Sequence, residues 1–151
     1  MAFIRQKAKS DCGVACLAML CDVTYEEAEK AITWRSSTSI YGTDTKQLRE
    51  GAAKLGYSTE STPQDRLRFI RAPKAWCNFP PPMKTDFWYL IPDNSLVKIL
   101  HPGGRSYGWH WVVWRRNKIY DPARGAFHPS KYRSKPISYM MFIKETDECM
   151  N

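Results

Sequence analysis

The amino-acid sequence lacks any uninterrupted apolar run of about 20 residues, the length that a helix needs to span a membrane. It also lacks the pattern of a signal peptide, because the N-terminus is short, polar and basic and Cys12 already lies inside the first apolar run. Internal repeats and low-complexity segments are missing as well. These absences argue against a membrane span and predict a free-standing globular chain in the cytoplasm.

Cysteines are few, and their spacing suggests no pairs. The five of them, Cys12, Cys16, Cys21, Cys77 and Cys149, are an odd number and show no spacing typical of a metal site. A disulfide framework or a zinc centre is therefore not expected, and neither a metal nor a cofactor is predicted. A reduced, cytoplasmic environment fits this pattern and would keep a reactive thiol intact.

The length and composition fit one compact domain over residues 1–151. With 43% hydrophobic residues, a chain of this size can bury roughly 70% of its unfolded surface. Helices are expected first and strands later, which predicts an α+β fold with a helical half of about 1–60 and a strand half of about 85–145. The expected helices are 12–21, 24–32 and 45–55, and the expected strands are 87–90, 97–100, 109–114, 118–120 and 138–144.

Residues 6–20, QKAKSDCGVACLAML, are the most informative stretch. Cys12 opens an apolar run that is typical of a helix, and the positive end of a helix dipole favours a thiolate. The side-chain amide of Gln6 could reach the same point and donate a hydrogen bond to a developing oxyanion. The stretch therefore predicts a nucleophilic cysteine with an oxyanion donor beside it.

A β-rich apolar run, residues 109–114, is interrupted by one histidine, His110, and is followed by a polar break suited to a hairpin turn. With an even-length loop, facing residues have numbers that sum to an odd value, so His110 and Asp121 fall on the same face of the hairpin. A carboxylate that accepts from one imidazole nitrogen holds the ring as a general base needs it. Cys12, His110 and Asp121 are therefore predicted to form a triad.

Each of these residues also has an ordinary structural explanation. A cysteine on an apolar helix is usually a packing residue, as we expect for Cys16 and Cys21. The other two histidines, His101 and His128, precede prolines and have no comparable partner. The combined pattern, and not any single member, supports catalysis. Asp11 is expected to be structural, through the helix start or nearby backbone N–H groups.

These residues resemble a known family. Gln6, the segment from Asp11 to Ala15, the strand that begins with His110, and Asp121 followed by proline look like the papain-like cysteine peptidases that trim double-glycine leader peptides from bacteriocins. The resemblance implies a papain-like α+β fold, with N-terminal helices packed on a C-terminal antiparallel sheet. It also implies a Cys-His-Asp triad with a glutamine in the oxyanion hole.

Three functions remain open from the sequence. The first is a cysteine peptidase that hydrolyses a specific peptide or protein. The second is a deamidase or transglutaminase that uses the same triad on glutamine side chains, since both amides give the same thioester. The third is a catalytically silent binding module that uses the basic, aromatic half of the chain.

The positive charge is concentrated in the middle of the chain. Residues 64–135 carry fourteen Lys or Arg and four Asp or Glu, within a net charge of +8. This excess fits a solubilising face or an acidic peptide or protein partner. No nucleic-acid-binding motif accompanies it, which argues against nucleic acid. The segment 76–88 is expected to wall the substrate groove, and the oligomeric state stays open.

Overall fold

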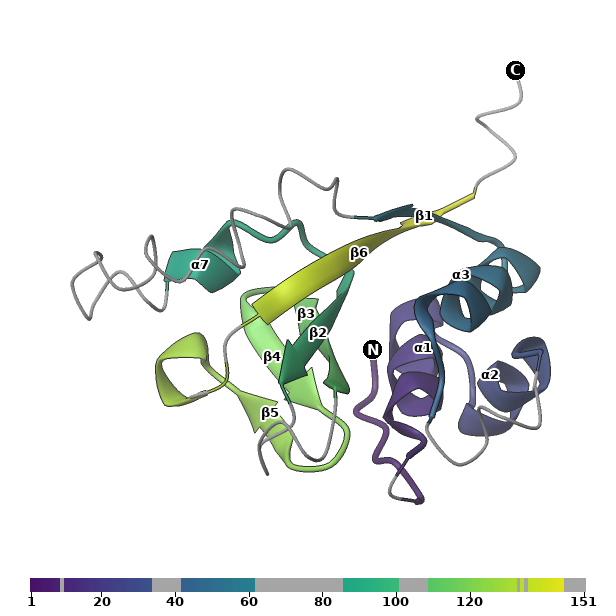
Figure 1. The fold of residues 1–151 in the computed structure, drawn as a ribbon, viewed down its shortest axis with the longest axis horizontal. Coiled ribbons are helices and arrows are strands. Elements are labelled where there is room, and N and C mark those ends of the chain that lie inside the picture. The colour runs from purple at the N-terminus through teal and green to yellow at the C-terminus, as the bar shows by residue number, and fades with distance from the viewer. Residues whose placement is uncertain are drawn as a thin grey trace.

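The computed structural model of the chain describes residues 1–8, 10–33, 42–61, 86–100, 109–132, 134 and 136–145. A group of helices lies beside an antiparallel sheet, and the N-terminal segment runs between them (Figure 1). The proline-rich segment and most of the expected groove wall, His101, Cys77 and Cys149 lie outside the described residues.

The first part of the chain forms α1 (Cys12–Cys21), α2 (Tyr25–Ala31) and α3 (Thr45–Lys54). All residues of α1 are buried, which is typical of a helix that is apolar on every side and sits in a core. The Thr24 hydroxyl accepts from Glu27 N and starts α2. A capping box between Asp44 and Gln47 starts α3. Gly56, at φ +88°, ends this segment in the left-handed region, which glycine adopts without strain.

A six-stranded sheet follows, and all its described pairings are antiparallel. Its order is β1-β6-β2-β3-β4-β5. The strands are β1 (Tyr57–Ser61), β2 (Ser95–Leu100), β3 (Trp109–Arg115), β4 (Lys118–Asp121), β5 (Gly125–Phe127) and β6 (Pro136–Lys144). Two short elements complete the described structure, α7 (Asp86–Tyr89) and the 3-10 turn η2 (Pro129–Lys131).

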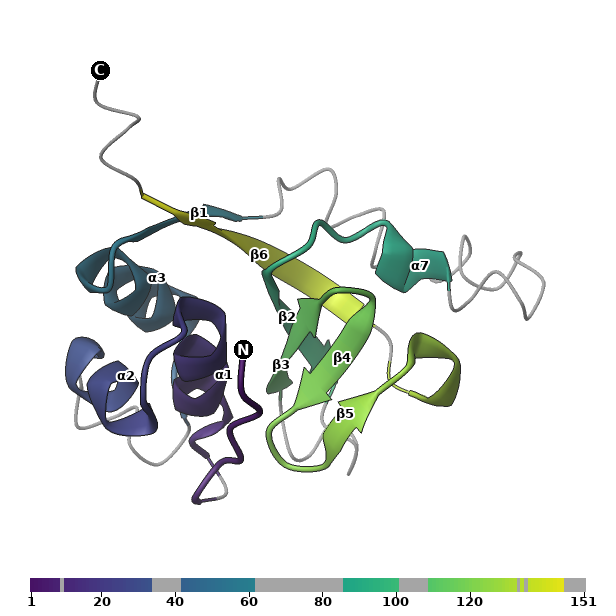
Figure 2. The same ribbon diagram turned by 180° about the vertical axis from the view of Figure 1, so that it is seen from behind.

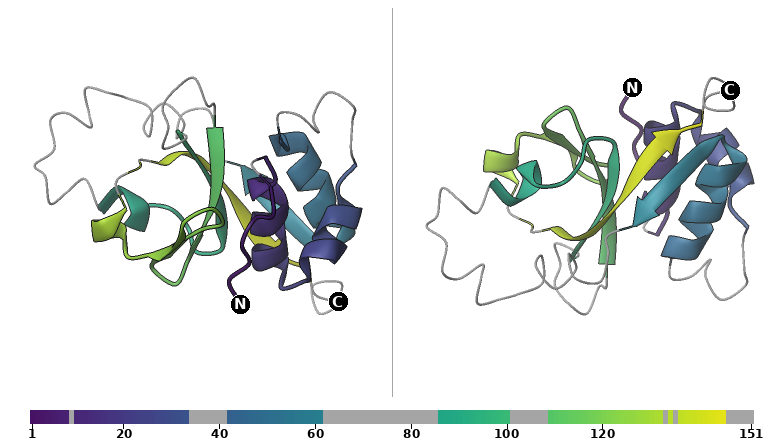
Figure 3. Two further views of the ribbon diagram at one scale, coloured as in Figure 1. Left: turned by 90° about the horizontal axis from the view of Figure 1, so that it is seen from below. Right: turned by 90° about the horizontal axis from the view of Figure 1, so that it is seen from above.

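Two apolar clusters lie on opposite faces of β3, because side chains alternate along a strand. Trp111 and Val113 join the cluster that includes α1, whereas Val112 and Trp114 join a second cluster that includes Trp88. Figure 2, from behind, shows α1 to α3 gathered beside the strands. The views from below and above in Figure 3 show the same separation of helices and sheet. His110 lies two residues before Val112 on β3, so its side chain is on the same face of the strand as the second cluster.

The hairpin between β3 and β4 sets the geometry of the predicted pair. Val113 pairs with Tyr120, across a turn in which Arg116 and Asn117 have φ of 49° and 61°. Two successive positive φ values are typical of a type I′ hairpin turn. Continued along the strands, this register puts Asp121 one diagonal step from His110 on the same face, which confirms that prediction.

The α+β fold, with N-terminal helices packed on an antiparallel sheet, is confirmed, but two local predictions are wrong. Residues 87–90 do not form a strand, because Asp86–Tyr89 is a single turn of helix. Residues 57–60 are not helical, because Tyr57–Ser61 is a strand paired with β6. The helical half of the chain therefore supplies one edge of the sheet. Of the helices in the described part of the chain, none combines the length and the apolar character required to cross a membrane.

Candidate active site

Cys12 is the first residue of α1 and is 7% exposed. The following residue, Gly13, allows α1 to approach Thr43 closely, because a Cβ at Gly13 would overlap Oγ1 of Thr43. The same Thr43 accepts a hydrogen bond from Trp111 Nε1 through its backbone oxygen, at 3.0 Å. The start of α1 is thus fitted against β3, the strand that carries His110.

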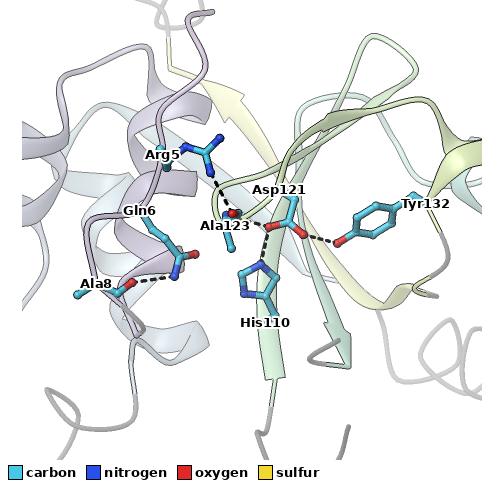
Figure 4. Close-up of polar contacts among 7 residues, drawn as sticks. All are labelled: Arg5, Gln6, Ala8, His110, Asp121, Ala123 and Tyr132. Atoms are coloured by element: carbon cyan, nitrogen blue, oxygen red, sulfur yellow. Dashed lines mark hydrogen bonds and ion pairs between the residues drawn. The ribbon is translucent and has the colours of Figure 1, made fainter. Parts of the chain in front are cut away.

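His110 and Asp121 form a buried pair, with His110 Nε2 at 2.8 Å from Asp121 Oδ1. Their side chains are 4% and 0% exposed. Figure 4 shows the imidazole and the carboxylate facing each other across the hairpin. A carboxylate in this position fixes both the tautomer and the orientation of an imidazole.

The pKa of His110 reflects both Asp121 and Cys12. Burial alone would lower the pKa of His110, but hydrogen bonds with Asp121 and with Cys12, and the charges of both, outweigh it and raise the pKa to about 9. Conversely, the hydrogen bond and the charge of His110 hold the pKa of Asp121 below its usual value despite burial. The structure therefore brings Cys12, His110 and Asp121 together.

The carboxylate of Asp121 has further donors that sequence reasoning missed. The hydroxyl of Tyr132 donates to Oδ2 at 2.7 Å, and Ala123 N donates to Oδ1 at 2.9 Å. Figure 4 shows Tyr132 on the side of Asp121 away from His110. The sequence holds no spacing signal for this contact, since the path from Asp121 to Tyr132 passes through β5 and η2.

Gln6 lies on the N-terminal segment beside the hairpin. Its backbone N–H donates to Pro122 O at 3.0 Å, directly after Asp121. Its side-chain Nε2 donates to Ala8 O at 2.7 Å, and Figure 4 shows the amide lying on the side of His110 that faces α1. Arg5 adds a second tie to the hairpin, from Nη1 to Ala123 O at 3.0 Å.

Asp11 organises the short loop between Gln6 and Cys12. Its carboxylate accepts from Lys7 N at 2.8 Å and from Ala8 N at 2.9 Å. It also accepts from the hydroxyl of Tyr25 at 2.6 Å. The side chain makes no capping bond to α1. The expected structural role is thus confirmed through neighbouring backbone N–H groups rather than through the helix start.

The other cysteines and the other histidine that the structure describes have structural roles. Burial raises the pKa of the Cys16 thiol well above its usual value and that of Cys21 to about 12. His128 is exposed and accepts from Ser130 N at the start of η2. Among the described residues, no group of three or more His, Cys, Asp or Glu side chains could hold a metal ion.

One expectation about the binding surface needs correction. Trp88 does not wall a groove, because it is 2% exposed and packs on Trp114 and Tyr132 in the second cluster. The basic turn lies at the far end of β3, where Arg115 is five residues, roughly 17 Å of strand, from His110.

Comparisons with known proteins agree with this arrangement. The model of the peptidase C39 family matches residues 1–131, which include every residue of the predicted site. None of the curated proteins matches the chain in sequence.

Two solved structures share the fold, each with a TM-score of 0.56 and 17% identity. One is a double-glycine-motif protease from an AMS/PCAT transporter in complex with the leader peptide, and it covers 96% of this chain and 91% of its own. The other is the peptidase domain of Streptococcus ComA, a bifunctional ABC transporter involved in a quorum-sensing pathway. The match covers 94% of this chain and 97% of that domain. Because the family model spans most of the chain, this protein belongs to the peptidase C39 family and is a cysteine peptidase.

Proposed function

We propose that Cys12 is the nucleophile of this peptidase, His110 its general base and Asp121 the group that orients the imidazole. The observation that carries the proposal is the position of His110. One of its ring nitrogens is hydrogen-bonded to a fully buried carboxylate, and the thiol at the start of α1 is among the groups that raise the pKa of the ring. Structural packing alone does not require these three groups in a row.

The chemistry follows from this arrangement. At neutral pH His110 already holds the proton of Cys12 as an imidazolium beside the Cys12 thiolate, and the thiolate attacks the carbonyl carbon of the scissile bond. The imidazolium then protonates the leaving amine as the C–N bond breaks, which leaves a thioester on Cys12. Water, deprotonated by His110, hydrolyses the thioester and restores the thiol.

Gln6 is proposed to stabilise the oxyanion together with the backbone N–H of Cys12. An amide nitrogen carries two hydrogens. In Gln6 one of them is given to Ala8 O at 2.7 Å, and this bond holds the nitrogen in one position. The bond to Ala8 thus fixes the donor before substrate arrives, which is how preorganised donors stabilise charge.

A peptide with two glycines before the cut is the proposed substrate class. The support is the similar fold of a double-glycine-motif protease that was solved with a leader peptide. Glycine lacks a side chain, so two of them fit a narrow approach to a buried thiol such as Cys12. The net charge of +8 favours peptides with acidic side chains through long-range attraction.

The test is incubation with a synthetic acidic peptide that contains Gly-Gly, followed by mass spectrometry of the products. Two fragments whose masses add up to the mass of the peptide plus one water support the peptidase. An intact backbone with a changed glutamine side chain would instead indicate deamidation or acyl transfer. Binding without any product in wild type and Cys12→Ala alike would indicate a silent binding module.

Replacement of Gln6 tests the oxyanion donor. We expect Gln6→Ala to lower kcat about 10²-fold with little change in KM, because the lost hydrogen bond forms in the transition state. Ala2→Gly on the same exposed segment serves as a matched control. A Gln6→Ala enzyme with wild-type kcat would remove Gln6 from the mechanism.

We also propose that the enzyme works in a reducing compartment such as the cytoplasm. Cys12, Cys16 and Cys21 are free thiols, and a nucleophilic sulfur must stay reduced to act.

A further inference from the structure

We propose that Tyr132 is a positioning residue of this active site, which acts on His110 through Asp121. The proposal rests on the triad proposed above and extends it by a fourth side chain. It starts from one contact, the bond from the Tyr132 hydroxyl to Asp121 Oδ2 at 2.7 Å. Tyr132 follows directly after the residues that the family model matches.

The carboxylate of Asp121 is held on both oxygens. Oδ1 accepts from Ala123 N and bonds with His110 Nε2, whereas Oδ2 accepts from the phenol of Tyr132. A carboxylate with donors on one oxygen only can rotate about its Cβ–Cγ bond. With the phenol in place, rotation would break a second hydrogen bond, and the oxygen that faces His110 is therefore fixed.

The ring of Tyr132 is itself clamped, so the hydroxyl cannot swing away. Trp88 meets it edge-on at 5.8 Å between ring centroids, and Phe127 lies at 5.3 Å. The guanidinium of Arg124 lies 5.6 Å from the ring centroid. The backbone N–H of Tyr132 donates to Pro129 O, which ties the residue to η2. These contacts hold the phenol oxygen within hydrogen-bond distance of Asp121.

The protonation state of Tyr132 suits a permanent donor. Burial and the charge of Asp121 raise its pKa far above the usual value, which the charge of Arg124 only partly opposes. The thiol of Cys16, on α1, acts in the same direction as Asp121. The phenol therefore stays neutral around neutral pH and keeps its proton for Asp121.

The test is Tyr132→Phe in the full chain, which removes one oxygen and keeps the ring. The first readout needs no substrate: the rate at which iodoacetamide alkylates Cys12 as a function of pH, followed by peptide mapping. We expect the rate at about pH 6 to fall about tenfold, the effect of one lost hydrogen bond to a charged group. The acidic limb of the profile should move to higher pH, because a less well-oriented imidazolium stabilises the Cys12 thiolate less. On a cleaved peptide, kcat should fall with KM unchanged.

Phe127→Leu is the matched control, because it disturbs the packing of the same ring and leaves the phenol in place. We expect it to lower Tm and to keep the wild-type labelling profile. A wild-type profile in Tyr132→Phe, or an equal loss in Phe127→Leu, would overturn the proposal and leave Tyr132 as a packing residue. If wild-type Cys12 labels no faster than the buried Cys16, the triad itself fails, which is a different result from a failure of Tyr132 alone.

Discussion

At the scale of single residues, the decisive feature is the charge state of His110. Its pKa is raised to about 9, compared with ~6.5 for an unperturbed histidine. The imidazolium is therefore the native form at neutral pH, paired with Asp121 and available to Cys12.

This shift makes stability depend on pH. The folded chain binds the His110 proton more tightly than the unfolded chain, so the stabilisation is complete below pH ~6.5 and is lost as pH rises through about 9. We expect the free energy of unfolding to fall over this window by on the order of 1–3 kcal/mol. Urea unfolding at a series of pH values measures it.

Two variants assign the effect. His110→Gln retains a donor for Asp121 but does not titrate, and we expect the decrease with pH to disappear. His128→Gln removes an exposed histidine and should leave the decrease intact. An unchanged pH dependence in His110→Gln would contradict the assignment.

Sequence reasoning could find the site where chemistry leaves a local signal. Cys12 at a helix start and His110 with Asp121 across a hairpin follow from short-range patterns. Tyr132 could not be found in this way, because its contact with Asp121 depends on the path of the chain through β5 and η2. No spacing rule predicts that path.

At the scale of elements, the start of α1 depends on Gly13. A methyl group there would meet Oγ1 of Thr43 and come within 3.3 Å of Leu48. We expect Gly13→Ala to cost about 1–3 kcal/mol of stability, as overpacking does, and to lower kcat because Cys12 moves with the helix. Thermal unfolding and peptide cleavage measure the two effects.

The double variant Gly13→Ala/Thr43→Ala tests the cause. Oγ1 of Thr43 is buried and has no hydrogen-bond partner among the described residues, so its removal alone should cost little. If the double variant is no better than Gly13→Ala, the clash lies elsewhere.

The loop before α1 gives a second prediction at this scale. Tyr25→Phe removes a donor to the Asp11 carboxylate, and we expect a loss of about 1–2 kcal/mol with a smaller drop in kcat than Gln6→Ala. The reason is that Asp11 holds the backbone of Lys7 and Ala8, on which the Gln6 side chain rests. Urea unfolding and peptide cleavage measure both.

Glu26→Gln is the control for this loop. It breaks the exposed ion pair with Lys7 on the same helix as Tyr25 without contact to Asp11, and exposed pairs contribute little. A loss of kcat in Glu26→Gln equal to that in Tyr25→Phe would refute the role of Asp11.

The misassigned elements have physical explanations. Residues 87–90 are aromatic and apolar, a composition typical of strands, but Trp88 and Ile91 are buried while Tyr89 and Leu90 are exposed. Burial of Trp88 and Ile91, three positions apart, is typical of a helical turn. β1 is polar, YSTES, and its pairing with β6 joins residues 79 to 87 positions apart, from Ser61–Met140 to Tyr57–Lys144, so a local pattern could not reveal it.

At the scale of the whole molecule, the sheet couples the two apolar clusters. Leu17, on α1, is fully buried in the first cluster, and Leu17→Ala should cost about 2–5 kcal/mol. Because β3 contributes to both clusters, we expect amide protection at Ile119, in the second cluster, to fall by the same free energy. Native-state hydrogen exchange measures it, and unchanged protection at Ile119 would mean that the two clusters unfold separately.

The division of the site between α1 and the hairpin has a consequence for biosynthesis. Roughly 100 residues separate Cys12 from His110, so the cysteine leaves the ribosome about 5–20 s before its base. During that time the thiol of Cys12 has no imidazole beside it, so the proposed mechanism cannot operate. Under the proposed mechanism, peptide cleavage can begin only after β3 and β4 have been synthesised. The order of translation therefore delays the activity.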